Sequence, residues 1–146
     1  MANIVPDSFK TDTLKGTFNF KSAAQGGGST FKIALFTSLG GFSTSTTTYT
    51  GAANEVANGS GYTTGGNTLT NNGVAVASNI AYVDFANTTW SSASITAVGA
   101  LIYKSSSNEA VLVLDFGGTK TSTNGDFEIA FPAATSSDAI IRLGDA

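Results

Sequence analysis

Hydrophobic and polar side chains alternate with a period of two along residues 94–132, and this stretch gives the clearest structural signal in the chain. Successive side chains of a β-strand point to opposite faces of a sheet. The pattern therefore predicts three consecutive antiparallel strands, of which the first two form a hairpin around residues 105–108. On the first strand we expect one face to carry Ile95, Ala97, Gly99, Leu101 and Tyr103.

The second and third of these strands supply core residues and most of the acidic side chains of the stretch. The second alternates two sets of residues, which are Leu112, Leu114 and Phe116 on one side and Val111, Val113 and Asp115 on the other. In the third, the side chains expected to point inward are Phe127, Ile129 and Phe131. Asp126 and Glu128 are expected to face outward, where acidic groups discourage unwanted pairing of sheet edges.

Shorter signals elsewhere complete an all-β pattern. Strands are predicted over residues 17–21, 31–37, 73–79, 80–86 and 139–143. Many short strands separated by turns rich in Gly, Ser and Asn are typical of an antiparallel β-sandwich or barrel. A jelly roll is the preferred architecture, and an immunoglobulin-like sandwich is an alternative that the sequence does not separate from it.

The N-terminus is predicted as an arm, residues 1–16, which precedes a single β-sandwich domain, residues 17–146. A short helical turn is expected over residues 8–14, with Asp7 or Ser8 as its cap. Ile4, Val5 and Phe9 are its apolar residues. They either dock on a partner or, in the slightly preferred interpretation, belong to an edge strand or a frayed end.

Three irregular regions hold aromatic side chains. Residues 51–72, which contain Tyr62, form either a long crossover, the preferred interpretation, or a recognition loop. Tyr49 closes a Ser/Thr-rich loop over residues 38–50. Trp90 is assigned to a connection, where it plugs the end of the core or, less favoured, forms a stacking platform. Because no alternating pattern buries Tyr49, Tyr62 or Trp90, they are candidates for exposed binding residues.

Composition narrows the classes of function. Charged residues are 12% of the 146 residues, and Ser, Thr, Asn and 17 Gly take their place, as on the surfaces of many extracellular or virion β-proteins. The net charge of −3, with seven scattered basic residues, gives no electrostatic footprint for nucleic acid or anionic lipid. The N-terminus lacks the layout of a secretory signal and no apolar run is long enough to cross a bilayer, so we expect synthesis in a cytoplasm and no membrane partner.

The residues also offer little for catalysis. His and Cys are absent, which removes the commonest general base and the thiolate ligands of metals, and no G-x-S-x-G elbow occurs. Asp115, Asp126 and Glu128 could in principle form a carboxylate pair for glycoside hydrolysis, but the alternation turns two of them outward. We therefore expect no enzyme activity, no metal site and no cofactor, with a glycan-degrading enzyme as a remote alternative.

Several fragments resemble small structural proteins of tailed bacteriophages. They are Asn54-Glu55-Val56, Gly61-Tyr62, Gly65-Gly66, Ile95-Thr96-Ala97, Gly99-Ala100, Ile102-Tyr103, the run from Leu114 to Gly118, Lys120, Phe127 and Phe131-Pro132. The similarity spans residues 31–143, and its fragments are specific in combination rather than singly. The role most similar is that of capsid cement (decoration) proteins, which are often jelly rolls that sit on the shell as dimers or trimers.

The resemblance implies a non-enzymatic protein on the outer capsid surface that binds the major capsid protein. It also implies self-association, with a homotrimer preferred and a homodimer as the alternative. The expected contact residues are Ile4, Val5, Phe9, Tyr49, Tyr62 and Trp90. The alternative from another class is a receptor- or carbohydrate-binding module of a phage tail or fibre, which would use residues 51–72 and Trp90.

Overall fold

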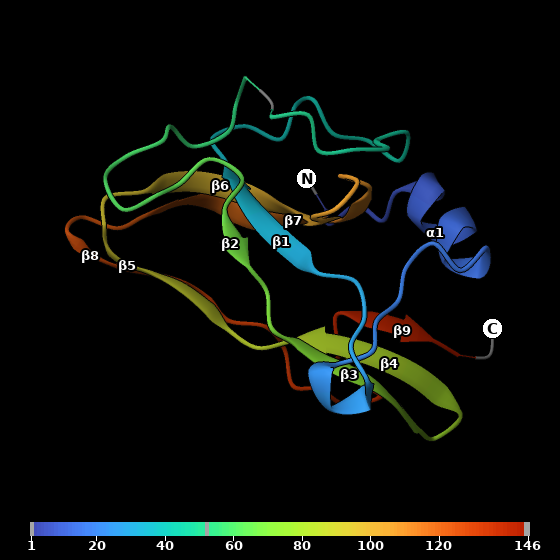
Figure 1. Cartoon of the computed structure of the whole chain (residues 1–146). Coiled ribbons are helices and arrows are strands. Elements are labelled where there is room, and N and C mark those ends of the chain that lie inside the picture. The colour runs from blue at the N-terminus through green and yellow to red at the C-terminus, as the bar shows by residue number, and fades with distance from the viewer. Residues whose placement is uncertain (1, 52, 145–146) are drawn as a thin grey trace.

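The computed structural model describes residues 2–51 and 53–144 and confirms an all-β protein built from antiparallel sheets (Figure 1). Its two short helices are α1 (Asp7–Leu14) and the 3-10 turn η1 (Ala23–Gln25). Its strands are β1 (Phe31–Phe36), β2 (Asn67–Thr68), β3 (Asn71–Ala77), β4 (Ile80–Phe85), β5 (Thr88–Ala93), β6 (Thr96–Lys104), β7 (Ala110–Thr121), β8 (Gly125–Ile129) and β9 (Ile141–Leu143).

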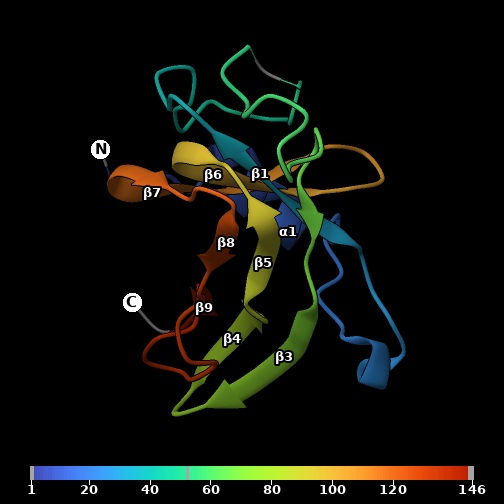
Figure 2. The ribbon, with the colours of Figure 1, turned by 90° about the vertical axis from the view of Figure 1, so that its left-hand side faces the viewer.

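The strands form three sheets. The largest has the order β2-β1-β6-β7, the second has the order β3-β4-β9, and β5 pairs with β8. Figures 1 and 2 show the largest sheet at one end of the molecule, the β3-β4-β9 sheet at the other, and the β5–β8 pair running between them. The arrangement is consistent with a β-sandwich, whereas the strand order of a jelly roll is not confirmed.

The largest sheet is buried on both faces. On β1, Phe31, Ile33 and Leu35 belong to the main core between the sheets. Ala34 and Phe36 point the other way into a second apolar cluster, which the loop of residues 38–50 covers. Figure 1 shows this loop lying over β1, β6 and β7. Burial on both faces explains why β1 is almost continuously apolar.

The predicted hairpin of β6 and β7 is present, but the predicted face of β6 is wrong. The register shifts between Ala97 and Gly99, because four residues of β7, 116–119, lie opposite the single residue between them. At this irregularity β6 also breaks its own alternation, because Val98 packs against the second cluster and a Cβ on Gly99 would meet Leu39 of that same cluster. Ala97 consequently packs in the main core together with Ala100, and Leu101 packs in the second cluster.

The inward and outward faces of β8 are as predicted. Phe127 is buried, and Ile129 and Phe131 pack against the main core. Asp126 and Glu128 are exposed. The alternation was readable in this strand because one of its faces meets the core and the other meets solvent.

Two predictions of local structure are wrong. Residues 17–21 do not form a strand, although the segment is extended and stacks Phe18 and Phe20 on Phe31, with ring centroids 6.5 Å and 4.7 Å away. The supposed connection at residues 87–92 is instead mostly strand β5. Thr favours strands, and the polar outer face of this Thr/Ser run masks the alternation that would have indicated one.

The β3-β4-β9 sheet has an apolar face that extends beyond the core. Residues directly opposite on antiparallel strands share a face. Val83 of β4 lies opposite Val74 of β3 and Ile141 of β9, so these three side chains share one face. Val83 is buried in the core. The next row along the same face is formed by Val76, Ala81 and Leu143, of which Val76 and Leu143 are exposed.

Candidate functional site

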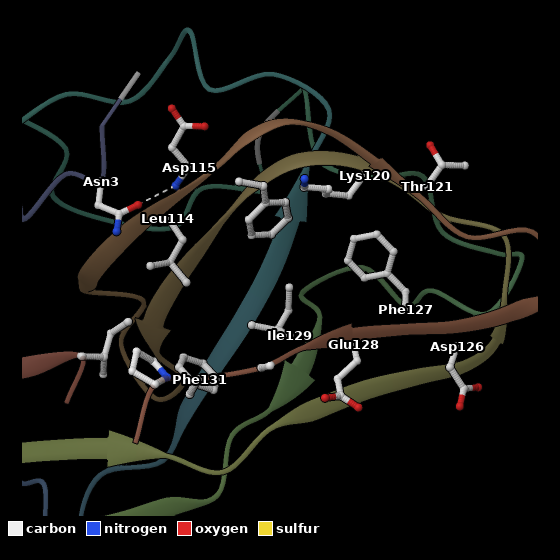
Figure 3. A pocket seen from close by; sticks show the side chains of 14 residues that line it. Asn3, Leu114, Asp115, Lys120, Thr121, Asp126, Phe127, Glu128, Ile129 and Phe131 are labelled. Carbon is white, nitrogen blue, oxygen red and sulfur yellow. Dashed lines mark hydrogen bonds between the residues drawn. The ribbon is translucent and has the colours of Figure 1, made fainter. Parts of the chain in front are cut away.

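A groove lined by both apolar and polar side chains lies between the edges of two sheets, where β7 borders the largest sheet and β8 borders the β5–β8 pair (Figure 3). Its volume is about 540 Å³. We call it the edge groove and define it by its apolar lining, which consists of Leu114, Phe116, Phe127, Ile129, Phe131 and Ile140. Within the described residues β8 pairs with β5 alone, so its second edge faces the groove without a strand partner.

Local sequence explains why the groove opens here. The inward set of β8 supplies one wall, and Figure 3 shows Phe127 and Ile129 pointing from β8 toward β7. Residues 116–119 of β7 leave the ladder with β6, and positive φ angles at Gly117 (69°) and Gly118 (143°) permit that excursion. The bulge moves this part of β7 out of regular pairing beside β8.

The acidic residues at the groove do not converge. Figure 3 shows Asp126 and Glu128 on the side of β8 away from β7, and the carboxylate of Asp115 lies beyond β7. Glu128 accepts a hydrogen bond from the side-chain amide of Asn87 at 3.2 Å. Asp126 and Glu128 therefore share one face of β8, while Asp115 lies apart from them on β7.

The N-terminal segment lies along the edge of β7 rather than projecting as a free arm. The N–H of Ile4 donates to the carbonyl of Val113, and the N–H of Val113 donates to the carbonyl of Ile4, both at 2.9 Å. The N–H of Asp115 donates to the side-chain oxygen of Asn3 at 2.8 Å. This pairing is that of a short edge strand, and it extends to one end of the edge groove.

The three predicted arm residues differ in their exposure to solvent. Phe9 is buried, with its ring centroid 5.1 Å from that of Phe18, and Ile4 is half-buried, whereas Val5 is exposed. The predicted helix is α1, but its N-cap is Pro6 and no side chain caps it, so the caps expected at Asp7 or Ser8 are wrong.

The predicted exposure of Tyr62 and Trp90 is also wrong. Trp90 is 4% exposed and Tyr62 is 2% exposed. Their ring centroids lie 6.0 Å apart, and Trp90 also meets Phe127 at 6.2 Å. Tyr49 is half-buried and stacks on Tyr103 at 4.3 Å. Long-range packing buries these rings, which local pattern did not reveal.

Tyr49 and Tyr62 instead donate to one half-buried polar cluster centred on Glu55. Each tyrosine hydroxyl donates to a different carboxylate oxygen of Glu55, at 2.7 Å in both cases, and the N–H of Gly65 donates at 2.6 Å. The hydroxyl of Tyr62 in turn accepts from the N–H of Leu35 at 3.0 Å. The cluster therefore ties residues 49–65 to strand β1.

The electrostatics of the cluster suit a structural role. Burial, followed by the hydrogen bond to Glu55, raises the pKa of Tyr62 and of Tyr49. Burial and the nearby Glu55 charge raise the pKa of Tyr103 to about 12. Each hydroxyl therefore stays protonated and able to donate at neutral pH. Val56 and Tyr62 are also core residues, so the segment that carries them is a crossover fixed to the sheet rather than a free loop.

Asp84, unlike Glu55, is a fully buried carboxyl, only 1% exposed. The N–H of Phe85 donates to one of its oxygens at 2.8 Å. Burial raises the pKa of Asp84, and hydrogen bonds from backbone N–H groups oppose that effect. It is not among the residues that line the edge groove.

Comparisons and searches for other site types add no assignment. No group of three or more His, Cys, Asp or Glu side chains suited to a metal ion occurs among residues 2–51 and 53–144. No helix in that part of the chain is long and apolar enough to span a membrane. No protein-family model, curated protein or solved structure matches the sequence or the fold.

Proposed function

We propose that the protein is a capsid cement protein of a tailed bacteriophage, a non-enzymatic structural protein that binds the major capsid protein from the outer surface of the shell. The observation that carries the proposal is the edge groove, a partly apolar channel between the edges of two strands. A strand edge offers backbone hydrogen bonds to an extended segment of another protein, and the channel accepts alternate side chains of that segment. The resemblance to phage structural proteins supports the choice of partner.

The groove suggests how one copy would stabilise a shell. An extended segment of a capsid subunit would lie beside β8, with every second side chain against Phe127 and Ile129. Asp126 and Glu128 point away from this channel, so the contact would depend on apolar burial and backbone hydrogen bonds. We therefore expect binding to change little between low and moderate salt, unlike a contact based on exposed ion pairs.

The carbohydrate-binding alternative loses its central residue. Stacking on a sugar ring needs an accessible aromatic face, and Trp90 is buried against Tyr62 and Phe127. Residues 51–72 are held by the Glu55 cluster rather than presented as a loop for recognition. No described feature favours this alternative over the capsid partner.

Binding to expanded phage heads that lack the cement protein tests the proposal. Purified protein is mixed with such heads and co-sedimentation is measured against protein concentration. Saturable binding with a fixed number of copies per head is expected, together with increased resistance of the heads to heat or to loss of DNA. Absence of binding to expanded heads of the cognate phage would contradict the proposal.

A matched pair of variants tests the contribution of the groove. Ala130 and Ala24 are both exposed, but only Ala130 lines the groove. Ala130→Arg should weaken head binding by roughly tenfold or more because the long side chain obstructs the channel, whereas Ala24→Arg should leave it unchanged. Equal binding by both variants would assign the head contact to another surface.

A further inference from the structure

Strand β3 borders its sheet, where it pairs with β4 alone, and its hairpin with β4 carries no charged residue over positions 71–83. The side chains of Val74 and Val76 are 43% and 72% exposed. An uncharged apolar strand with an open edge is a template for pairing with another chain, and proteins commonly block it with a charge, a proline or a bulge. The register irregularity of β3 lies before Val74, so residues 74–77 contain none of these devices.

The pairing with β4 determines which backbone groups of β3 point to the open edge. Ala77 pairs with Ile80 across a two-residue turn, and such a turn is closed by a hydrogen-bonded pair. Hydrogen-bonded and non-hydrogen-bonded pairs alternate from there along an antiparallel ladder. Val74 and Val76 are therefore non-hydrogen-bonded positions, whose N–H and carbonyl groups point away from β4. They present the groups to which an additional strand would bond.

The side chain of Gln25 occupies the first of these two positions. Its Nε2 donates to the carbonyl of Val74 at 2.8 Å, and its Oε1 accepts from the N–H of Val74 at 3.0 Å. A primary amide carries both a donor and an acceptor, as a peptide group does, so Gln25 bonds to Val74 as a residue of a neighbouring strand would. Figures 1 and 2 both show η1, a short blue turn, lying beside β3. We call this contact the Gln25 cap.

Neighbouring contacts hold the Gln25 cap against β3. The Oε1 of Gln25 also accepts from the N–H of Ser22 at 3.2 Å, which fixes the side chain within its own turn. The side-chain amide of Asn71 donates to the carbonyl of Phe20 at 2.9 Å and ties the chain that precedes the turn to β3. Gly73 permits the close approach, because a Cβ at this position would collide with the side chains of Gln25 and Ser22. The amide of Gln25 is thus positioned from both segments.

We propose that the Gln25 cap closes the edge of β3 to strands of other chains, with one amide group in place of a whole strand. Within the part of the chain that the structure describes, nothing bonds to the outward N–H and carbonyl of Val76. A strand that adds to β3 needs the groups of both valines, so it must first displace Gln25. The cap belongs to a different sheet from the edge groove, and this inference does not rest on the proposed function.

Amide hydrogen exchange of the full chain, followed by NMR, tests the contact itself. In the wild type the N–H of Val74 should have a protection factor roughly tenfold or more above that of Val76, because only the first is bonded at the open edge. Gln25→Ala should bring the two protection factors within about threefold of one another. Gln25→Asn should act in the same way, because its amide is one methylene too short to reach Val74. Similar protection of both valines in the wild type, or full protection of Val74 in the variants, would overturn the proposal.

Aggregation tests the consequence of removing the cap. Gln25→Ala should aggregate roughly tenfold or more faster than the wild type, measured by light scattering and thioflavin T fluorescence under conditions in which circular dichroism shows both to be folded. Adding Val76→Lys should restore the wild-type rate, because it places a charge on the open edge. Adding Leu14→Lys, at a similarly exposed position on α1, should not. A Gln25→Ala protein that aggregates no faster than the wild type, or one that both lysines rescue equally, would refute the role assigned to the cap.

Discussion

Replacing Tyr62 by phenylalanine removes one oxygen atom from the Glu55 cluster and leaves the ring in place. Two hydrogen bonds are lost, one from the hydroxyl to Glu55 at 2.7 Å and one from the N–H of Leu35 to the hydroxyl at 3.0 Å. Leu35 is fully buried, so water cannot replace the lost acceptor. An unpaired buried N–H costs about 1–3 kcal/mol, and a hydrogen bond to a charged group contributes about 1.5–3 kcal/mol.

Glu55 is half-buried and keeps its bonds from Tyr49 and Gly65, which reduces the second of these contributions. We therefore expect Tyr62→Phe to lower the free energy of unfolding by about 2–4 kcal/mol. Tyr49→Phe is the matched control, because it removes one hydroxyl bond to the same carboxylate but leaves no buried N–H unpaired. Its expected cost is about 1 kcal/mol.

Urea unfolding followed by far-ultraviolet circular dichroism measures both variants against the wild type. The informative quantity is the difference between the two variants rather than either value alone. If Tyr49→Phe costs as much as Tyr62→Phe, or if both cost less than about 0.5 kcal/mol, the unpaired N–H of Leu35 is not the dominant effect and the reasoning fails.

Three further changes test other parts of the fold, each by thermal or chemical unfolding. Phe127→Ala should cost about 3–5 kcal/mol and Glu128→Ala well under about 1 kcal/mol; equal effects would refute the assigned faces of β8. Gly66→Ala should cost about 3 kcal/mol or more because a Cβ would collide with the backbone of β1, whereas Gly117→Ala, at nearly the same φ but in open space, should cost about 1 kcal/mol. Asp84→Asn should be more stable relative to wild type at pH 7 than at pH 3, since burial raises the pKa of Asp84 and the wild type, unlike the variant, loses stability as pH rises from the unfolded to the folded pKa of this group; a variant less stable at pH 7 than at pH 3 relative to wild type would contradict this.

The parts of the fold that could be predicted are the strands whose two faces have a simple environment, either core on one side and solvent on the other, or core on both. The alternation of Phe127 and Glu128 is a local property of the sequence. The facing predicted from it is confirmed, because β8 has one buried and one solvated face. The apolar run of β1 was recognised for a related reason, since it is buried on both faces. The face of β6 was assigned wrongly after Ala97, because a bulge depends on the partner strand and leaves no mark in the sequence of β6.

The candidate site was predicted less well, because it depends on which distant segments meet. Trp90 and Tyr62 lie 28 positions apart in the numbering, in segments without clear alternation, yet they are packed together in the core. The edge groove results from two sheet edges that face one another, and no single strand encodes it. The exposure of Val76 and Leu143 likewise cannot be predicted from the alternation of their strands. Alternation indicates which residues share a face, but not where the core beneath that face ends.

The pairing of β1 with β6 has a kinetic consequence. Phe31 pairs with Lys104 and Phe36 pairs with Gly99, so the two central strands of the largest sheet enclose residues 37–98 as one long closed loop. The chain must lose the entropy of closing this loop before the contacts that compensate for it exist, and domains dominated by such distant pairings fold in roughly milliseconds to seconds. During synthesis, β1 leaves the ribosome several seconds before β6 at about 5–20 residues per second. A nearly uncharged apolar strand therefore waits without its partner, and protection of β1 by chaperones would be decisive for the yield of folded protein.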